Sequence, residues 1–227
     1  MQQKELTEQE SLKLITEMIG KTQSHFHESG ASTILWGTVI SFCALVSFAQ
    51  SFWNFSIGFD IWILTLVAVA PQIWIGIKEG RSRVVKTYQD SHIDTIWTVY
   101  VISIFAMLVY ANIVSYTSVK LLAGDGLEIF SKNISTGEVK PYRIFPPSFS
   151  SVMMVLYAFP TLATGLITKY KPLIAGAFIC YTCFVVSLFT SFTYDMLLSA
   201  IATICCWLIP GLMLRNKYLK QKKEKDV

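Results

Sequence analysis

The sequence predicts an all-α, polytopic integral membrane protein with six transmembrane helices, arranged as three antiparallel hairpins after an N-terminal amphipathic helix. Charged residues make up only 15% of the 227-residue chain and hydrophobic residues 53%, whereas soluble domains carry about 25% charged residues. The apolar residues are also collected in six long blocks with the charges between them. Both observations exclude an ordinary soluble domain and favour a chain that lies in a lipid bilayer.

Residues 1–30 are predicted to form a cytoplasmic amphipathic helix. Thr7 followed by Glu10 fits a capping box, in which two side chains satisfy backbone N–H groups at a helix start. From there Leu12, Ile15 and Ile19 recur on one face, while the opposite face is charged. Such a helix packs on the membrane surface, on the bundle that follows it, or on a partner protein, and the sequence leaves these alternatives open.

Six apolar blocks follow, each long enough to cross the hydrocarbon core, which takes about 17–25 residues. The predicted spans are residues 31–52, 57–77, 95–116, 151–169, 172–193 and 196–214. Short links between the first and second spans, and between the fifth and sixth, favour tight antiparallel pairs. One longer outer loop, residues 117–150, contains the turn signals GDG and STG and favours a small β-hairpin.

The basic residues are distributed unequally between the predicted spans. Fifteen of the nineteen Lys and Arg lie in the N-terminal segment, in the second-to-third and fourth-to-fifth links and in the tail, and four lie in the loop 117–150. The positive-inside rule therefore predicts that both termini are cytoplasmic, as an even number of spans requires. We expect a bacterial inner-membrane location.

The basic tail, residues 215–227, is predicted to attract anionic lipid. The net charge of +4 suggests nucleic-acid binding only when the basic residues share one exposed face. In this chain they flank the apolar blocks instead. We therefore expect no direct contact with nucleic acid.

Pro71, Pro160 and Pro210 lie inside the second, fourth and sixth blocks. Membrane helices tolerate proline because neighbours satisfy the carbonyl that it frees, and a kink is the expected result. Transporters place broken helices around a midplane substrate site, but two of these prolines are off-centre, so we predict that all three shape helices. Small residues at helix spacing, Gly37 with Ser41 and Gly176 with Cys180, are predicted to serve contacts between helices.

Asp60, Asn112 and Asp195 lie near the predicted outer ends of the spans and are the candidates for an outward-facing polar pocket. The alternative is that they act as helix caps and interfacial anchors, since a helix N-terminus stabilises an anion. The middle of every block lacks Asp, Glu, Lys, Arg and His. This argues against a proton-coupled pump, which needs ionisable groups at depth.

The three histidines provide the one candidate metal site. His25, His27 and His92 are all predicted at the cytoplasmic surface, and Asp94 follows His92 in the segment DSHID. Histidine and carboxylate are ligands of zinc and iron. However, His25 and His27 are two residues apart, so a helix would direct them to different faces. Asp94 and Ser91 also have an alternative role as caps of the third span.

Catalytic and cofactor motifs are absent from the sequence: it contains no G-x-S-x-G, H-E-x-x-H, Walker loop or dinucleotide fingerprint. We therefore expect neither enzymatic activity nor a cofactor. Cys180 and Cys183 form a C-x-x-C, a spacing found in redox and zinc motifs. Because all five cysteines fall inside apolar blocks, we predict that they are packing residues.

The run ESLKLITEMI, Glu10 to Ile19, followed by HESGASTILWG, His27 to Gly37, resembles an uncharacterised family of bacterial six-span inner-membrane proteins. In that family an amphipathic helix leads into a first span with an ILWG-type start. The resemblance implies the same topology and no particular activity. We expect a non-enzymatic membrane interaction or sensing component, with a cytoplasmic protein partner or a homo-oligomer. The alternative is a small permease for an uncharged or amphipathic solute.

Overall fold

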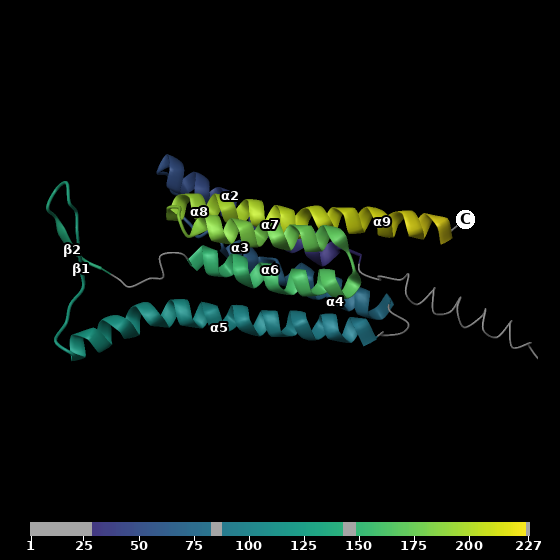
Figure 1. Cartoon of the computed structure of the whole chain (residues 1–227), viewed down its shortest axis with the longest axis horizontal. Coiled ribbons are helices and arrows are strands. Elements are labelled where there is room, and N and C mark those ends of the chain that lie inside the picture. Colours follow the sequence, from purple (N-terminus) through teal and green to yellow (C-terminus); the bar gives the residue numbers. More distant parts are fainter. Residues whose placement is uncertain (1–28, 83–87, 143–148, 226–227) are drawn as a thin grey trace, which may run out of the picture.

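A computed structural model describes residues 29–82, 88–142 and 149–225. Most of the predicted amphipathic helix, residues 1–28, therefore lies outside the described residues. The described chain is mostly helical, and its long helices run side by side along one axis (Figure 1). Its helices and strands, in chain order, are α2 (Ala31–Trp53), α3 (Ile63–Val67), α4 (Val69–Ser82), α5 (Tyr88–Gly124), β1 (Phe130–Lys132), β2 (Val139–Pro141), α6 (Phe149–Thr168), α7 (Lys171–Ser187), α8 (Phe192–Thr203), η1 (Ile204–Leu208) and α9 (Ile209–Lys225).

Five helical stretches are long and apolar enough to cross a membrane. By length and composition these are Ala31–Trp53, Ile63–Arg81, Tyr88–Val114, Phe149–Thr168 and Phe192–Gln221. The remaining apolar helix, α7, has 17 residues and is shorter than these five. The predicted helical membrane class is therefore confirmed, while the sixth span stays a prediction.

The helix that contains the third predicted span extends beyond it at both ends. Helix α5 has 37 residues and includes positions 117–124 of the predicted loop. Hydropathy marks where an apolar stretch ends, but a helix continues until a residue that breaks it. The break comes at Gly124–Gly126, where Gly126 has a φ of 74°, a value that suits glycine. In the same way α9 continues as helix through most of the predicted basic tail.

The helix of the second predicted span begins at Ile63, after the predicted start of the span at residue 57. Residues 57–60 are not helical, because Gly58 has a φ of 83° and the Asp60 carboxylate accepts the backbone N–H of Trp62 at 3.0 Å. The helix also changes at Ala68, between α3 and α4. Pro71 has no N–H to donate to the carbonyl of Val67. The irregularity therefore falls where a proline is expected to disturb the helix.

The other two prolines differ in their surroundings. Pro160 is buried inside α6, which stays α-helical around it. Pro210 lies two residues after the end of the π-helix η1, whose C-cap residue Ile209 donates its N–H to the carbonyl of Ile204. Because Pro210 cannot donate to the carbonyl of Cys206, the wider π-helical turn lies where an α-helical bond is lost.

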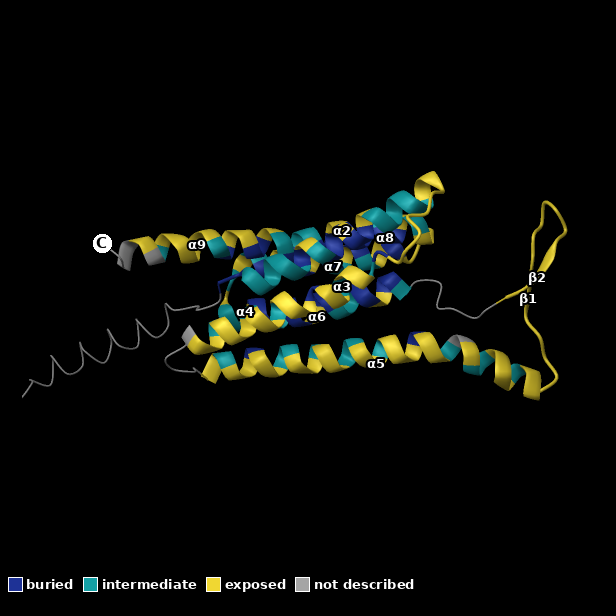
Figure 2. Cartoon of the chain, turned by 180° about the vertical axis from the view of Figure 1, so that it is seen from behind, coloured by how far each residue is buried: buried dark blue, intermediate teal, exposed yellow. Residues whose placement is uncertain are grey.

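The core of the bundle lies between α2, α6, α7 and the continuous rod of α8, η1 and α9. Figure 2 shows the buried residues on these elements, and they include Met154, Ala158, Cys180 and Trp207. The most extensive packing joins α6 with α7 and α2 with α8. Both pairs cross the boundaries of the three predicted hairpins, so that arrangement stays a prediction.

Two parts of the bundle are peripheral. Only 6% of the apolar stretch of α5 is buried, and the same share of α3–α4, against 50% for α6. Among the described elements, the backbone of α5 packs closely only on α6. Figure 2 shows α5 largely in the colour of exposed residues.

The predicted β-hairpin is confirmed. Strands β1 and β2 pair antiparallel, with Phe130 opposite Pro141 and Lys132 opposite Val139. All six strand residues are exposed. Figure 1 places the hairpin at one end of the bundle, beyond the end of α5, and the C-terminus at the other. These are called the hairpin end and the C-terminal end below.

Candidate functional site

An aromatic cluster lies where α5 meets the core. It consists of Trp97 and Tyr100 from α5, Tyr157 from α6 and Trp207 from η1. The ring centroid of Trp207 lies 4.9 Å from that of Tyr157 and 6.3 Å from those of both Trp97 and Tyr100. Such separations are typical of favourable aromatic pairs. The cluster is therefore the main side-chain contact between the peripheral helix α5 and the central rod.

Two threonines of α6 satisfy the indole N–H groups of this cluster. Trp207 Nε1 donates to Thr161 Oγ1 at 2.7 Å, and Trp97 Nε1 donates to Thr164 Oγ1 at 3.2 Å. Both threonines are buried. A buried N–H without a partner would be costly, so these bonds fix both tryptophans against α6.

Two glycines allow η1 to approach its neighbours closely. A Cβ atom on Gly37 of α2 would lie 2.7 Å from the backbone nitrogen of Leu208. A Cβ atom on Gly176 of α7 would contact the carbonyl of Cys205 and lie 2.9 Å from the Cα of Cys206. The predicted role of these glycines in helix contacts is confirmed. The π-helix is held between them, with Trp207 directed into the cluster.

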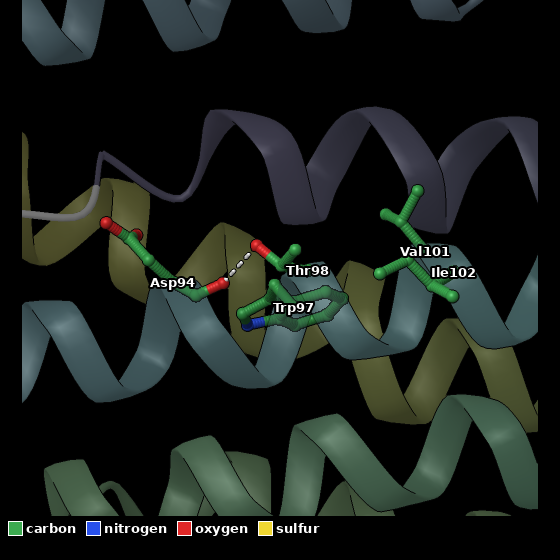
Figure 3. A pocket seen from close by; sticks show the side chains of 5 residues that line it. All are labelled: Asp94, Trp97, Thr98, Val101 and Ile102. Carbon is green, nitrogen blue, oxygen red and sulfur yellow. Dashed lines mark hydrogen bonds between the residues drawn. The ribbon is translucent and has the colours of Figure 1, made fainter.

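A shallow, open groove of about 520 Å³ lies on α5 beside this cluster. It is lined by Asp94, Trp97, Thr98, Val101 and Ile102 (Figure 3). The Thr98 hydroxyl donates to the backbone carbonyl of Asp94 at 2.7 Å, so its proton is used within the helix. The groove is mainly apolar and suits an acyl chain or an apolar side chain of another helix.

The predicted metal site is only partly inside the described residues, since His25 and His27 are not. His92 is exposed on α5, and its ring meets that of Tyr88 edge-on at 4.2 Å between centroids. Across residues 29–82, 88–142 and 149–225, no group of three or more His, Cys, Asp or Glu side chains is placed to hold a metal ion. Asp94 lies well inside α5, which begins at Tyr88, so its alternative role as a cap is wrong.

The structure does not join the three predicted outer residues by hydrogen bonds. Asp60 is exposed and bonds to the chain two residues away. Asn112 is exposed on α5, and its Nδ2 donates to the carbonyl of Leu108 at 2.8 Å. Asp195 differs from both, because it is only 1% exposed. A shared pocket of these residues stays a prediction, and the burial of Asp195 was not expected from the sequence.

Polar contacts at the C-terminal end hold α4 against the start of α2. Gln72 Nε2 donates to Ser32 Oγ at 3.1 Å, and the Ser29 hydroxyl donates to the Glu79 carboxylate. These two contacts connect residues 40 and 50 positions apart. They compensate for the small apolar contact of α4 with the core.

The cysteines are packing residues in the structure. All five are free thiols, and four of them are buried. The Cys180 thiol donates to the carbonyl of Met154 at 3.2 Å, which links α7 to α6. The predicted packing role is therefore confirmed for these residues.

The fold defines a class, that of helical membrane proteins with several apolar helices and no extensive soluble domain among the described residues. The comparisons with protein-family models, curated proteins and solved structures gave no match.

Proposed function

We propose that this chain is a non-enzymatic interaction or sensing component of a membrane, in which α5 is the helix that contacts a partner protein. The observation that carries the proposal is the unequal burial of the helices. Only 6% of the apolar stretch is buried in α5 and in α3–α4, against 50% in α6, and the stretch in α5 is the longer of the two poorly buried ones, with 27 residues against 19. The aromatic cluster connects α5 to the central rod, so a partner on α5 would act on the same element that continues into α9.

Exposed apolar surface alone does not require a partner, because lipid tails are as apolar as leucine. The polar side chains of α5 supply the argument. Five of them donate a hydrogen bond to the backbone carbonyl four residues earlier, namely Thr95, Thr98, Ser103, Asn112 and Thr117. Three of these five are exposed, namely Thr95, Thr98 and Asn112, whereas on the shorter α7 Thr182 is the exposed residue with this bond. The bonds use a donor proton within the helix, but the side-chain oxygens can still accept a hydrogen bond from a neighbouring helix, and polar side chains favour contacts between membrane helices.

The proposed topology has six spans and cytoplasmic termini in a bacterial inner membrane. Helix α7, with 17 residues, meets the lower limit for a span. Figure 1 shows the end of α4, the α6–α7 link and the C-terminal part of α9 toward one end of the bundle, and these carry most of the basic residues. The positive-inside rule supports a cytoplasmic location for that end. The exposed lysines of α9 would contact anionic lipid there.

Site-specific photo-crosslinking in native membranes tests the proposal. A photoreactive amino acid replaces Ile102 on α5, which is 63% exposed, or Phe178 on α7, which is 60% exposed. The two positions are matched in size and exposure, so lipid alone would react equally with both. A discrete protein adduct at Ile102 but not at Phe178 supports a partner on α5, and its mass separates another protein from a second copy. Lipid adducts alone at both positions contradict the proposal.

A small permease is the second candidate, favoured by the groove beside α5. The groove is open to its surroundings, and Trp97 forms one of its walls. Purified protein in liposomes would then carry an uncharged solute faster than empty vesicles do. Trp97→Ala, which widens the groove, would change the rate or the range of solutes. Equal flux with and without protein would remove this candidate for the solutes tested.

A further inference from the structure

We propose that Asp195 and the oxygen atoms around it, where α6, α7 and α8 meet at the hairpin end, form a binding site for a sodium ion. Asp195 is only 1% exposed and lies in the first turn of α8. Its Oδ1 accepts a hydrogen bond from Thr190 Oγ1 at 2.6 Å. Its Oδ2 is buried and has no hydrogen-bond partner among the residues that the structure describes. The site is independent of the interaction proposed for α5.

A buried carboxylate needs a counter-charge or a ligand, because removing the ionised group from water is costly. Helix α8 packs on α2, α6, α7 and η1. These elements contain one basic residue, Lys171, which lies at the far end of α7. The other titratable groups on them are thiols and phenols, namely Cys43, Tyr157, Cys180, Tyr181, Cys183, Cys205 and Cys206, and Tyr194 lies on α8 itself. None of these groups supplies a positive charge to Asp195.

Hydroxyl groups continue from Asp195 into the neighbouring helices. Thr190 Oγ1 lies 3.3 Å from the carbonyl of Ser187, the last residue of α7. Ser187 Oγ lies 2.7 Å from Ser151 Oγ in α6, and both serines are buried. Ser150, next to Ser151, is also buried, and its Oγ has no hydrogen-bond partner in the described part of the chain. Asp195 Oδ2 and Ser150 Oγ are thus two buried oxygens without a hydrogen-bond partner in the described part of the chain, one in the first turn of α8 and one in the first turn of α6.

The donor types favour an alkali cation. Carboxylate, hydroxyl and carbonyl oxygens are hard ligands, and the C-terminal end of a helix such as α7 carries partial negative charge. Broken or ending helices supply such oxygens to Na⁺ in membrane transporters. Calcium sites use six to eight oxygens and usually several carboxylates, whereas Asp195 supplies a single negative charge. Sodium fits this charge and these ligands best.

Sodium binding to the full chain in detergent is the direct test. Equilibrium dialysis with radioactive Na⁺ measures the stoichiometry, and thermal unfolding compares NaCl with choline chloride at equal ionic strength. We expect about one Na⁺ per chain and a Tm higher by about 3–6 °C at a Na⁺ concentration about tenfold above Kd. Asp195→Asn should lose both effects. Asp125→Asn is the matched control, since its carboxylate is exposed, and should keep both.

A milder variant keeps the test valid if Asp195→Asn does not fold. Ser150→Ala removes one unsatisfied hydroxyl and should weaken Na⁺ binding several-fold, with little change of the Tm in choline. A wild-type chain that binds no Na⁺ and unfolds at the same temperature in both salts overturns the proposal. A Tm that follows pH but not Na⁺, and loses this dependence in Asp195→Asn, also overturns it and identifies a proton as the ligand.

Arg143 is the basic residue between β2 and α6 in the chain, and it lies outside the described residues. Its variant Arg143→Gln decides whether an arginine is the counter-charge of Asp195. Retained Na⁺ binding in Arg143→Gln supports the sodium site. If instead Arg143→Gln and Asp195→Asn each lower the Tm, and the double variant lowers it no further, the two residues form an ion pair and the proposal is overturned.

Discussion

Gly37→Ala tests the close approach of α2 to the π-helix η1. The added methyl group would lie 2.7 Å from the backbone nitrogen of Leu208 and 2.9 Å from its Cα. An ordinary contact of this kind is about 3.4–4 Å, so the two helices must separate by roughly 0.5–1 Å. The obstacle is backbone, which cannot rotate away as a side chain can. We therefore expect the core around η1 to be strained by a single methyl group.

The expected cost follows from two opposing effects. Overpacking a well-packed core costs about 1–3 kcal/mol, while alanine is favoured over glycine in a helix by about 1 kcal/mol. The net loss of unfolding free energy should be about 0–2 kcal/mol, which corresponds to a Tm lower by up to about 8 °C for a chain of this size. Thermal unfolding in detergent, recorded at one fixed scan rate, measures it.

Gly76→Ala is the matched control, because a Cβ atom at this helical position in α4 would meet no atom within 4 Å. It should leave the Tm unchanged or raise it slightly. A Gly37→Ala variant as stable as Gly76→Ala would refute the close packing of α2 on η1.

Three further outcomes are expected. Thr161→Val should lower the free energy of unfolding by about 1–3 kcal/mol, because it leaves Trp207 Nε1 buried without an acceptor. Adding Trp207→Phe to the same chain removes this N–H and should recover part of the loss. If the losses of the two single variants simply add in unfolding experiments, the hydrogen bond is contradicted. In the folded protein, N-ethylmaleimide should modify Cys205 before the four buried cysteines, and mass spectrometry of the labelled peptides measures the rates. Equal rates at all five cysteines would contradict the burial of the other four. Gln72→Leu should weaken the attachment of α4 to α2, because it removes the hydrogen bond from Gln72 to Ser32. We expect faster proteolysis of the α4–α5 link and little change in Tm. An unchanged cleavage rate would mean that this bond does not hold α4 against α2.

The sequence predicted the helical membrane class well, because apolar blocks of about 20 residues with few charges are typical of membrane spans. It predicted the helix ends poorly. The apolar stretch of α5 stops near Val114, but nothing before Gly124 breaks the helix. Hydropathy also cannot separate α5 from α6, since lipid and protein interiors are both apolar, so the peripheral position of α5 was not predictable.

The sequence contained partial signals for the central contacts. Gly37 and Gly176 had the spacing of helix-contact residues, and Pro210 marked where an α-helical bond is lost, but their common partner η1 depends on the tertiary arrangement. The burial of Asp195 was missed for a similar reason. Its exposure depends on how the short link from α7 to α8 folds back on α6, and local sequence does not specify that.

The length of α5 determines where the β-hairpin lies relative to a membrane. With 37 residues at about 1.5 Å each, α5 is about 55 Å long, against about 40–45 Å for a bilayer with its headgroups. If α5 begins at one headgroup surface, it holds the hairpin roughly 10 Å above the other, even with a tilt of about 20°. That height is close to one Debye length at physiological salt. The charged side chains of the hairpin would therefore lie in the ionic environment of the bulk solution and outside the potential of the lipid surface; these are Lys132, Glu138 and Lys140.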